Sequence, residues 1–428
     1  MATGRVLTAE TKYRLLLQIS QKISGTLDLD EILNHILDTV RAVLDYDAAG
    51  IFVLTREDPF SRFGHRQQVI AGMASRGFHE RPLEDDEMLR LGKGIIGHVI
   101  ATGQPVIAPD VGLNPHYIEG RRDTRAEIAV PITLDGRVVG AVNLESDRKD
   151  AYGESDLEAL RFFADAAGMS IEKAMLHRQL LEKRRIETQL QIAHDVQSRL
   201  LPASAPSVPG YDIAGLSIPT YDVGGDYFDY LPLPGDCLGL VVADVAGKGI
   251  PAALIMATFR TLLRLSARLE PEVSVAMRAV NRFLVESSSL PGFVTAVYGV
   301  LDPEHGRFHY ANCGHNPPVI VRKDGRIEKL TCGGPFLGVF DAVTYESADT
   351  RLTPGDLLVL YTDGVVEAAP AGGDEFGVAR LAAVAHEART RPATDIIESV
   401  VLATRDFSGA RTYDDDFTLL VVRRNAEA

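Results

Sequence analysis

Residues 238–249 read LGLVVADVAGKG, an apolar strand-like run that ends in an aspartate and then in a glycine-rich turn. Two distant stretches, DLLVLYTDG at 356–364 and DDDFTLLVV at 414–422, also place aspartates at the edge of an apolar run. Such carboxylates can meet at one end of a sheet, and the glycines allow a ligand to approach the backbone closely. Oxygen ligands suit hard divalent cations such as Mg2+ or Mn2+. The three segments therefore predict a metal-dependent hydrolase.

The composition indicates a globular protein of more than one domain. At 428 residues the chain exceeds one ordinary core, and 46% of its residues are hydrophobic. A net charge of −15 without a basic stripe argues against a nucleic-acid partner. Cys237, Cys313 and Cys332 lack metal-ligand spacing and fit a reducing compartment. Because we identify no membrane-spanning stretch and no signal peptide, we expect a cytoplasmic enzyme with no membrane partner.

Residues 10–174 are predicted to form one α+β unit. Helical spacing is present at 15–24 and 29–44, and the segments 48–54 and 67–75 are typical of strands. The segment 126–146, AEIAVPITLDGRVVGAVNLES, predicts a hairpin, because Asp135 and Gly136 suit a tight turn between two apolar runs.

This unit resembles a GAF domain. The resemblance is carried by GKGIIGHVIATGQPVI at 92–107, by PITLDGRVVGAVNLES at 131–146 and by the helix that follows. It implies a sensor for an unknown small molecule, or a dimerising module. The unit has no cysteine for covalent bilin attachment. Its unpaired histidines are interpreted as surface or core residues rather than haem ligands: His65, His79, His98 and His116.

Residues 155–205 are predicted to form a helical linker that ends at a group of prolines. Its apolar positions recur in steps of three and four, as a coiled-coil seam requires. The first part of this seam contains Leu157, Leu160, Ala164, Ala167, Ile171 and Ala174. After Arg178 the seam resumes with Ile186, Leu190, Ala193 and Leu200, with Gln197 as a polar member. We expect a parallel homodimer, and a connector packed on one domain is the alternative.

Residues 209–425 are predicted to form a third unit. Strand-like runs such as LGLVVAD, VTAVYGV and DLLVLYT alternate with helical stretches at 251–269, 272–287 and 378–403. The order predicts an α/β sandwich of mainly antiparallel sheets flanked by helices.

The motif VGGDYFD at 223–229 adds Asp226 and Asp229 to the three acidic segments. A single Asp-Gly step is usually a turn, but the four motifs in this order are specific. The unit resembles the SpoIIE/RsbU branch of the PPM-type (type 2C) metal-dependent serine/threonine protein phosphatases. The matching segments are VGGDYFD, DVAGKGIPAALIM, ANCGHNPP, GGPFLGVF, YTDGVVEA, DDDFTLLVV and the preceding QIAHDVQSRLLP.

The resemblance implies a site that holds two Mn2+ or Mg2+ ions. By motif position the catalytic metal ligands would be Asp226, Asp244, Asp363 and Asp415, joined by the carbonyl of Val245. Accessory positions would be Asp229, Gly247, Lys248, Gly364 and Asp416. Two such ions, roughly 3.5–4 Å apart, clamp phosphoryl oxygens and lower the pKa of an attacking water. The implied substrate is a phosphoserine or phosphothreonine on an anti-sigma-factor antagonist with a STAS domain.

Some relatives hold the phosphate with an arginine shortly before the first aspartate. The segment IPTYDVGGD has none, so we assign phosphate contact to the metals and to Lys248. Cys313 and His315 could suggest a thiol nucleophile, but no acid orients the histidine, and a structural role is preferred.

A sensor histidine kinase is the alternative function. His194 and Asp195 on a dimer-type helix resemble a phospho-acceptor box, and DVAGKGIP resembles part of an ATP lid. The chain lacks a convincing asparagine box between these segments, and a kinase leaves TDG and DDDFT without a role. The phosphatase is therefore the preferred interpretation.

Overall fold

The computed structural model describes residues 26–55, 69–78, 93–220, 222–287, 292–409 and 413–426. The chain divides into two compact units, residues 1–185 and 186–428, and each is described by itself. The helix expected at 15–24, together with His65 and His79, lies outside the described residues.

The first unit is built on an antiparallel sheet in the order β2-β1-β5-β4-β3. Its strands are β1 (Ala48–Thr55), β2 (Val69–Arg76), β3 (Val106–Ala108), β4 (Ala126–Leu134) and β5 (Arg137–Ser146). The predicted hairpin between β4 and β5 is confirmed. Asp135 and Gly136 have φ values of 47° and 75° at its turn, the left-handed backbone that a primed turn requires.

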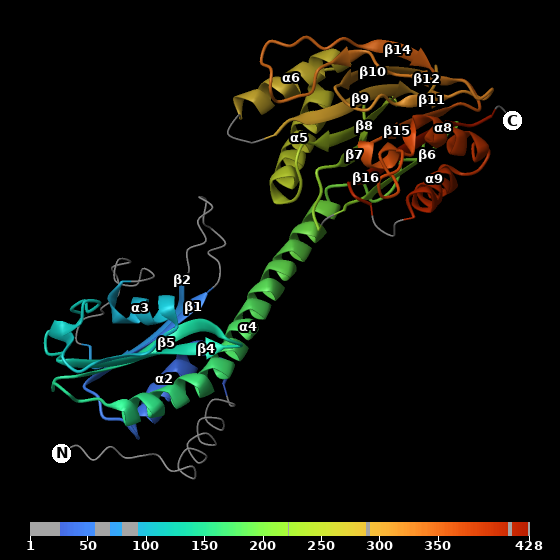
Figure 1. Ribbon diagram of the computed structural model, residues 1–428. Coiled ribbons are helices and arrows are strands. Elements are labelled where there is room, and N and C mark those ends of the chain that lie inside the picture. Colours follow the sequence, from blue (N-terminus) through green and yellow to red (C-terminus); the bar gives the residue numbers. More distant parts are fainter. Residues whose placement is uncertain are drawn as a thin grey trace. The chain divides into compact units, whose positions relative to one another are not determined.

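Helices cover both faces of this sheet (Figure 1). Helix α2 (Leu29–Arg41) begins at Asp28, whose side chain accepts a hydrogen bond from the Glu31 backbone N–H. Its apolar residues and the first half of α4 (Glu154–Ser198) pack on one face and form the main core of the unit. Helix α3 (Gly94–Thr102) and the short 3-10 helix η1 (Val111–Leu113) pack on the other face in a smaller apolar cluster.

The predicted coiled-coil seam requires a correction in its first half. Leu160, Ala164, Ala167, Ile171 and Ala174 are buried in the core of the first unit, and Leu157 packs against it. An amphipathic helix on a sheet shows the same three-and-four spacing as a coiled coil. These residues therefore contact their own domain and leave no free seam for a second chain.

The second unit contains two sheets packed face to face. One has the order β13-β10-β9-β8-β7, with β14 paired to β10, and the other has the order β12-β11-β15-β16-β6. The first contains β7 (Tyr227–Pro232), β8 (Leu238–Val245), β9 (Val294–Asp302), β10 (Arg307–Cys313), β13 (Gly333–Gly334) and β14 (Ala348–Arg351). The second contains β6 (Tyr211–Ile218), β11 (Val319–Val321), β12 (Ile327–Lys329), β15 (Leu357–Tyr361) and β16 (Phe417–Arg424).

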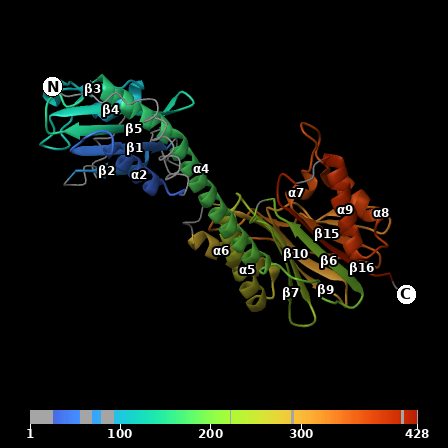
Figure 2. The ribbon, with the colours of Figure 1, turned by 90° about the horizontal axis from the view of Figure 1, so that it is seen from below.

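Helices cover the outer face of each sheet. Helices α5 (Ile250–Leu269) and α6 (Val273–Glu286) pack on the first sheet. Helices α8 (Gly377–Glu387) and α9 (Ala393–Ser408) lie side by side on the second sheet, as Figure 2 shows, and the short α7 (Asp363–Val366) precedes them. The predicted α/β sandwich is confirmed, and the helical stretch expected at 378–403 is two helices.

By length and composition, α5 is the single helix in the described part of the chain that could cross a membrane. The sequence interpretation, which found no such stretch, missed it. Its Ala252, Ile255, Met256, Phe259 and Leu263 are buried in the core beside the first sheet. Packing inside the second unit explains these residues, whereas Ile250, Leu254, Leu265 and Leu269 of the same helix are exposed.

Candidate metal and phosphate site

The predicted acidic residues lie where strands begin or end. Asp244 is near the end of β8, and Asp226 immediately precedes β7, whose Tyr227 is paired with Ala243. In the other sheet Asp363 follows β15 and Asp415 precedes β16, and Tyr361 is paired with Leu419. Antiparallel pairing thus brings each pair of segments together at one edge of its own sheet.

A threonine links the two edges. Asp226 is buried, and one of its carboxylate oxygens accepts a hydrogen bond of 2.8 Å from the Oγ1 of Thr362 in the other sheet. The same Oγ1 accepts from the backbone N–H of Thr418 at 3.0 Å. The edges of both sheets therefore meet here, whereas the sequence predicted that the acids converge at one end of a single sheet.

The pKa values identify these acids as electrostatic neighbours. Burial first, and then the charge of Asp244, hold the pKa of Asp226 well above its ordinary value. Burial, followed by Asp363 and Asp415, raises the pKa of Asp244 to about 7. Burial and then Asp415 also raise the pKa of Asp363. The site thus concentrates negative charge that the protein itself neutralises only in part.

The donor set was tested against the expected divalent ions. In the described residues, no three His, Cys, Asp or Glu side chains converge closely enough to hold a metal by themselves. Mg2+ is commonly held by one or two carboxylates together with water and phosphate oxygens. The carbonyl oxygen of Val245 lies beside Gly225, 2.8 Å from where a Cβ would stand, and Asp244 Oδ1 lies 3.4 Å from that point. One carboxylate and one carbonyl oxygen near the same point fit a hard cation that keeps most of its water shell.

The loop before Asp226 is fixed by two side chains. Asp416 accepts hydrogen bonds from the backbone N–H groups of Thr220 at 2.8 Å and Gly225 at 2.9 Å. From the end of α4, Gln197 donates to the carbonyl of Gly224 at 2.7 Å and accepts from its N–H at 3.1 Å. Asp416 therefore holds the backbone of the loop, and Gln197 joins the helix to it.

Lys248 lies at the mouth of the site. Its ammonium is 3.0 Å from Asp415 Oδ2 and donates to the carbonyl of Asp414 at 3.0 Å. Gly247 and Gly249 on either side have φ values of 106° and 75°, which favour glycine. A cavity of about 290 Å3 opens here, lined by Lys248, Gly364, Glu367, Ala368, Ala369, Ser408, Tyr413, Asp414 and Asp415. Gly364 has no room for a side chain, because a Cβ would lie 2.1 Å from the Asp416 carbonyl oxygen.

Asp229 is directed to a different partner. It is fully buried and forms two hydrogen bonds with the guanidinium of Arg264 on α5, at 2.7 and 2.9 Å. Tyr227 also donates its hydroxyl to this carboxylate. Asp229 therefore connects β7 to α5, with its charge matched by an arginine.

The motif ANCGHNPP contributes a buried histidine rather than a nucleophile pair. His315 contacts the Thr295 hydroxyl at 2.8 Å and the Tyr361 carbonyl at 3.1 Å. Burial lowers the pKa of His315 to about 4, and burial raises that of the Cys313 thiol. His315 is thus a neutral bridge between β9 and the end of β15, next to Asp363.

Sequence reasoning missed three residues that organise the site. Thr362 lies inside the TDG motif, and its position between a strand and an aspartate was the available signal. Gln197 was assigned to a helix seam, and Arg264 was not considered. Their contacts join segments 27 to 136 residues apart, which no local pattern reveals.

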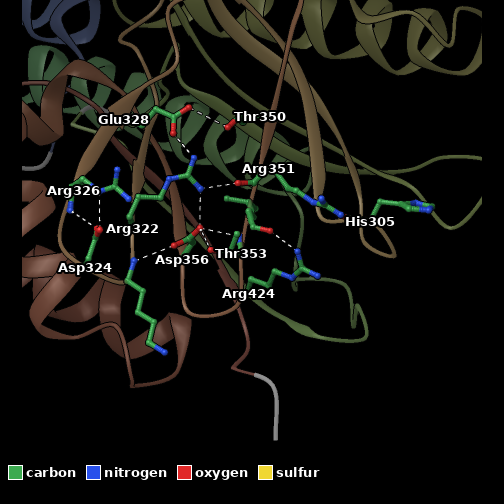
Figure 3. Close-up of polar contacts among 12 residues, drawn as sticks. His305, Arg322, Asp324, Arg326, Glu328, Thr350, Arg351, Thr353, Asp356 and Arg424 are labelled. Carbon is green, nitrogen blue, oxygen red and sulfur yellow. Dashed lines mark hydrogen bonds and ion pairs between the residues drawn. The ribbon is translucent and has the colours of Figure 1, made fainter.

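A larger cavity of about 620 Å3 lies elsewhere, lined by Asp302, His305, Arg307, Asp349, Thr350 and Arg351. Its acids are already paired, His305 with Asp302 at 2.9 Å and Arg307 with Asp349 at 3.7 Å. Figure 3 shows part of its rim beside the buried Asp356, which is bound by Arg322 and Thr353. Because its charges are balanced, we do not assign chemistry to this cavity.

His194, on the part of α4 that belongs to the second unit, contacts a loop of the same unit. Its Nδ1 lies 2.6 Å from the carbonyl oxygen of Asp222, in the loop that leads to Asp226. An imidazole engaged with this loop fits a structural contact better than a phospho-acceptor.

Comparison with known families divides the chain in two. Residues 26–172 match the GAF domain family, and residues 234–425 match the family described as Stage II sporulation protein E (SpoIIE).

Two curated relatives and one solved structure align with about half of the chain. Phosphoserine phosphatase RsbU of Bacillus subtilis is 29% identical over 56% of this chain and 71% of its own length. Protein IcfG of Synechocystis is 29% identical over 55% of this chain and 42% of its own length. The SiaA-PP2C domain of Pseudomonas aeruginosa superimposes with a TM-score of 0.51 at 23% identity, over 56% of this chain and 98% of that domain. This structure supports the fold, and the kinase alternative finds no support in these comparisons.

Proposed function

We propose that this chain, which joins a GAF domain to a SpoIIE-type PP2C phosphatase domain, hydrolyses phosphoserine or phosphothreonine in a protein substrate. The observation that carries the proposal is the gathering of Asp226, Asp244 and Asp363 from two sheets at one incompletely neutralised site. The name of RsbU, a phosphoserine phosphatase, supports the substrate class. The chain spans 71% of RsbU and 42% of IcfG, so the activity of the whole protein is our inference.

The ligands proposed for two Mn2+ or Mg2+ ions are Asp226, Asp244, Asp363, Asp415 and the carbonyl of Val245. Such ions supply positive charge for the phosphoryl oxygens and make a water a better nucleophile at neutral pH. The raised pKa values of the acids support this assignment, because a bound cation would relieve the repulsion that raises them.

The remaining residues position the reacting groups. Thr362 fixes one oxygen of Asp226, and Asp416 holds the loop that carries it. Lys248 is the ammonium at the edge of the 290 Å3 cavity, and we assign it to contact the phosphate of the substrate. The seryl or threonyl oxygen leaves as the phosphoryl group passes to water.

We assign the substrate to the STAS-domain antagonists of anti-sigma factors, on the resemblance to RsbU. The GAF domain is proposed to regulate the reaction through α4, in a cytoplasmic homodimer. Three free cysteines are consistent with a reducing compartment. Of the predicted second-half seam, Ile186 is exposed, as a partner helix would require, whereas Leu200 packs against the core of the second unit.

The test is Mn2+-dependent phosphate release from p-nitrophenyl phosphate and from a phosphoserine peptide. Native protein should release phosphate only with the metal, and Asp363→Asn should lose the activity. His194→Ala should keep most of it. Activity that needs no divalent ion, or that survives in Asp363→Asn, would overturn the proposal.

A further inference from the structure

The motif GGPFLGVF at 333–340 exposes apolar side chains on the surface of the second unit. Val339 is 47% exposed and Phe340 is 48% exposed. Pro335 is exposed as well, and Phe336 is half-buried. Single exposed apolar residues are common on protein surfaces, whereas a contiguous group of them marks a place where another molecule binds. The metal and phosphate assignments above give these side chains no role.

The loop that carries these side chains is held by its backbone. Leu337 is fully buried and forms two backbone hydrogen bonds with Val294, of 3.0 and 2.8 Å. The buried side chain of Asn281 on α6 accepts from the N–H of Gly338 at 2.9 Å. The same side chain donates to the carbonyl of Phe340 at 2.8 Å. The loop therefore presents its exposed side chains from a fixed backbone, so a binding partner does not have to order it first.

Three phenylalanine rings form a row that leads from this loop to the end of β8. The ring centroids of Phe340 and Phe336 are 5.6 Å apart, and those of Phe336 and Phe293 are 4.4 Å apart. The carbonyl of Phe293 accepts a hydrogen bond of 2.9 Å from the N–H of Ala246. Ala246 directly follows Val245, whose carbonyl is one of the proposed metal ligands. The phenylalanine row therefore begins beside the metal site and ends at an exposed ring.

The middle of the row also lies against a segment of the site. A Cβ at Gly314 would be 2.6 Å from the backbone nitrogen of Phe336. The next residue, His315, contacts the carbonyl of Tyr361 at 3.1 Å, two residues before Asp363. The row is therefore joined by short contacts to segments of both sheets that carry the acids.

We propose that the phenylalanine row, together with Val339, binds an apolar side chain close to the phosphoserine of a protein substrate. This inference rests on the proposed phosphatase function, because it requires the substrate's phosphate to lie at the metal site. The row is continuous with that site through Ala246, so residues near the phosphoserine can reach the rings. A surface of four side chains suits a short segment of polypeptide. A second copy of this chain fits less well, since a stable interface involves roughly 20–30 residues on each side.

The test compares three substrates of the full chain in the presence of Mn2+: p-nitrophenyl phosphate and two short phosphoserine peptides. In one peptide the phosphoserine is flanked by glycine and alanine, and in the other a leucine stands two positions before it and two positions after it. Native protein should hydrolyse the leucine peptide with a kcat/KM at least about tenfold higher, mainly through a lower KM, because the bound leucine is removed from water. Equal kcat/KM values for the two peptides would overturn the proposal.

Two variants locate the surface, and a third is the control. Phe340→Ser removes the exposed end of the row and should reduce the preference for the leucine peptide to less than about threefold. Its hydrolysis of p-nitrophenyl phosphate should stay at the native rate. Phe340→Leu keeps an apolar side chain and should retain the preference. Leu402→Ser changes a side chain that is 60% exposed on α9, beside the other sheet, and should behave as native protein with all three substrates.

The proposal is wrong if Phe340→Ser keeps the full preference, or if it loses activity on p-nitrophenyl phosphate to the same extent. Should light scattering also show a native dimer and a monomeric Phe340→Ser variant that keeps the preference, the surface belongs to a second copy of the chain. Hydrolysis of p-nitrophenyl phosphate without any peptide preference contradicts this inference alone. Absence of metal-dependent hydrolysis with all three substrates contradicts the proposed function as well.

Discussion

Strand β15 is flanked by two aspartates whose surroundings are opposite in character. Asp356, before the strand, is 1% exposed and binds Arg322 at 2.8 Å, the Thr353 N–H at 2.8 Å and the Lys323 N–H at 3.0 Å (Figure 3). Burial alone would raise the pKa of Asp356, but the Thr353 N–H and Arg322 outweigh it and hold the pKa below the ordinary value. Asp363, just beyond the strand, has a raised pKa because of burial and Asp415.

The difference separates acids whose charge is compensated inside the fold from acids whose charge is not. The surroundings of Asp356 supply hydrogen bonds and an arginine, so the cluster is complete without any further group. Around Asp363, Asp415 adds negative charge, and Lys248 is the charged group that opposes its effect on the pKa of Asp363. Incomplete compensation of this kind is typical of functional sites. Glu127 on β4 and Glu145 on β5 of the first unit resemble Asp363, because burial raises the pKa of both carboxyl groups.

The largest effect on activity is expected at the acids beyond the end of β15, whose charge is not compensated. Asp244→Asn should lower metal-dependent phosphate release by about a thousandfold, since losing metal-based charge stabilisation costs several kcal/mol. The same change removes repulsion, so the free energy of unfolding should stay equal or increase. The two readouts are phosphate release with Mn2+ and urea denaturation followed by circular dichroism.

The control for that variant is Asp236→Asn, in the exposed turn at the other end of the β7–β8 hairpin. It should change neither activity nor stability. A marked loss of stability in Asp244→Asn would mean that Asp244 is compensated like Asp356, and the contrast would disappear.

At Asp356, before β15, a substitution should change the stability of the protein and leave its catalysis unchanged. Asp356→Asn leaves Arg322 without its buried partner, and we expect a loss of about 3 kcal/mol in the free energy of unfolding. Asp324→Asn breaks the exposed pair with Arg326 nearby and should cost less than about 0.5 kcal/mol. Both variants should keep their phosphate release per folded molecule. Equal stability of the two variants would contradict the assignment.

The sequence predicted the acids around Asp363 but not the buried partners of acids such as Asp229. Apolar runs that end in Asp244 and Asp363, or that follow Asp415, predicted strands with acids at their edges, because hydrophobic patterning is a local signal. The hairpin at Asp135 and Gly136 was predicted for the same reason. The sequence could not reveal that Asp229 pairs with Arg264, since their 35-residue separation contains no signal.

The helix between the two domains marks the other limit of sequence reasoning. A stripe with steps of three and four indicates a buried face but does not say what buries it. For Leu160 and Ile171 the burying partner is the first domain's own core rather than a second helix. The role of Gln197 depends on a loop 27 residues away and was equally invisible.

Gln197 extends the comparison from charged groups to the backbone that holds them. Gln197→Ala removes both hydrogen bonds to Gly224, which are worth about 2 kcal/mol together, and should weaken Mn2+ binding up to about thirtyfold. Free Mn2+ measured by electron paramagnetic resonance reports this without relying on activity. Gln197→Glu keeps one of the two contacts and should lie between Gln197→Ala and native protein.

Gln191→Ala is the matched control on the same helix, because Gln191 donates to Asp195 of the same helix at 3.2 Å, in an exposed contact. It should bind Mn2+ as native protein does. Identical affinities in Gln197→Ala and Gln191→Ala would show that the loop before Asp226 does not need the helix.

The smallest effect is expected in the first domain. There the pH dependence of stability tests whether the buried Glu127 lacks a compensating positive charge. Burial and then Glu145 raise its pKa to about 8 in the folded state, above the ordinary value of 4.5. Below pH 4.5 the group is neutral in both states, and stability is unaffected. As pH rises toward 8 the unfolded chain loses the proton first, so stability falls by up to about 1.4 kcal/mol per pH unit. Glu127→Gln has no such slope.

Hydrogen exchange of residues 126–146 should therefore quicken in native protein relative to Glu127→Gln, by up to about tenfold between pH 6 and 7. For the control Asp135→Asn, in the exposed turn of the same hairpin, the exchange rate relative to native protein should not change with pH. A constant ratio of the rates in native protein and Glu127→Gln would mean that Glu127 is ionised and compensated like Asp356.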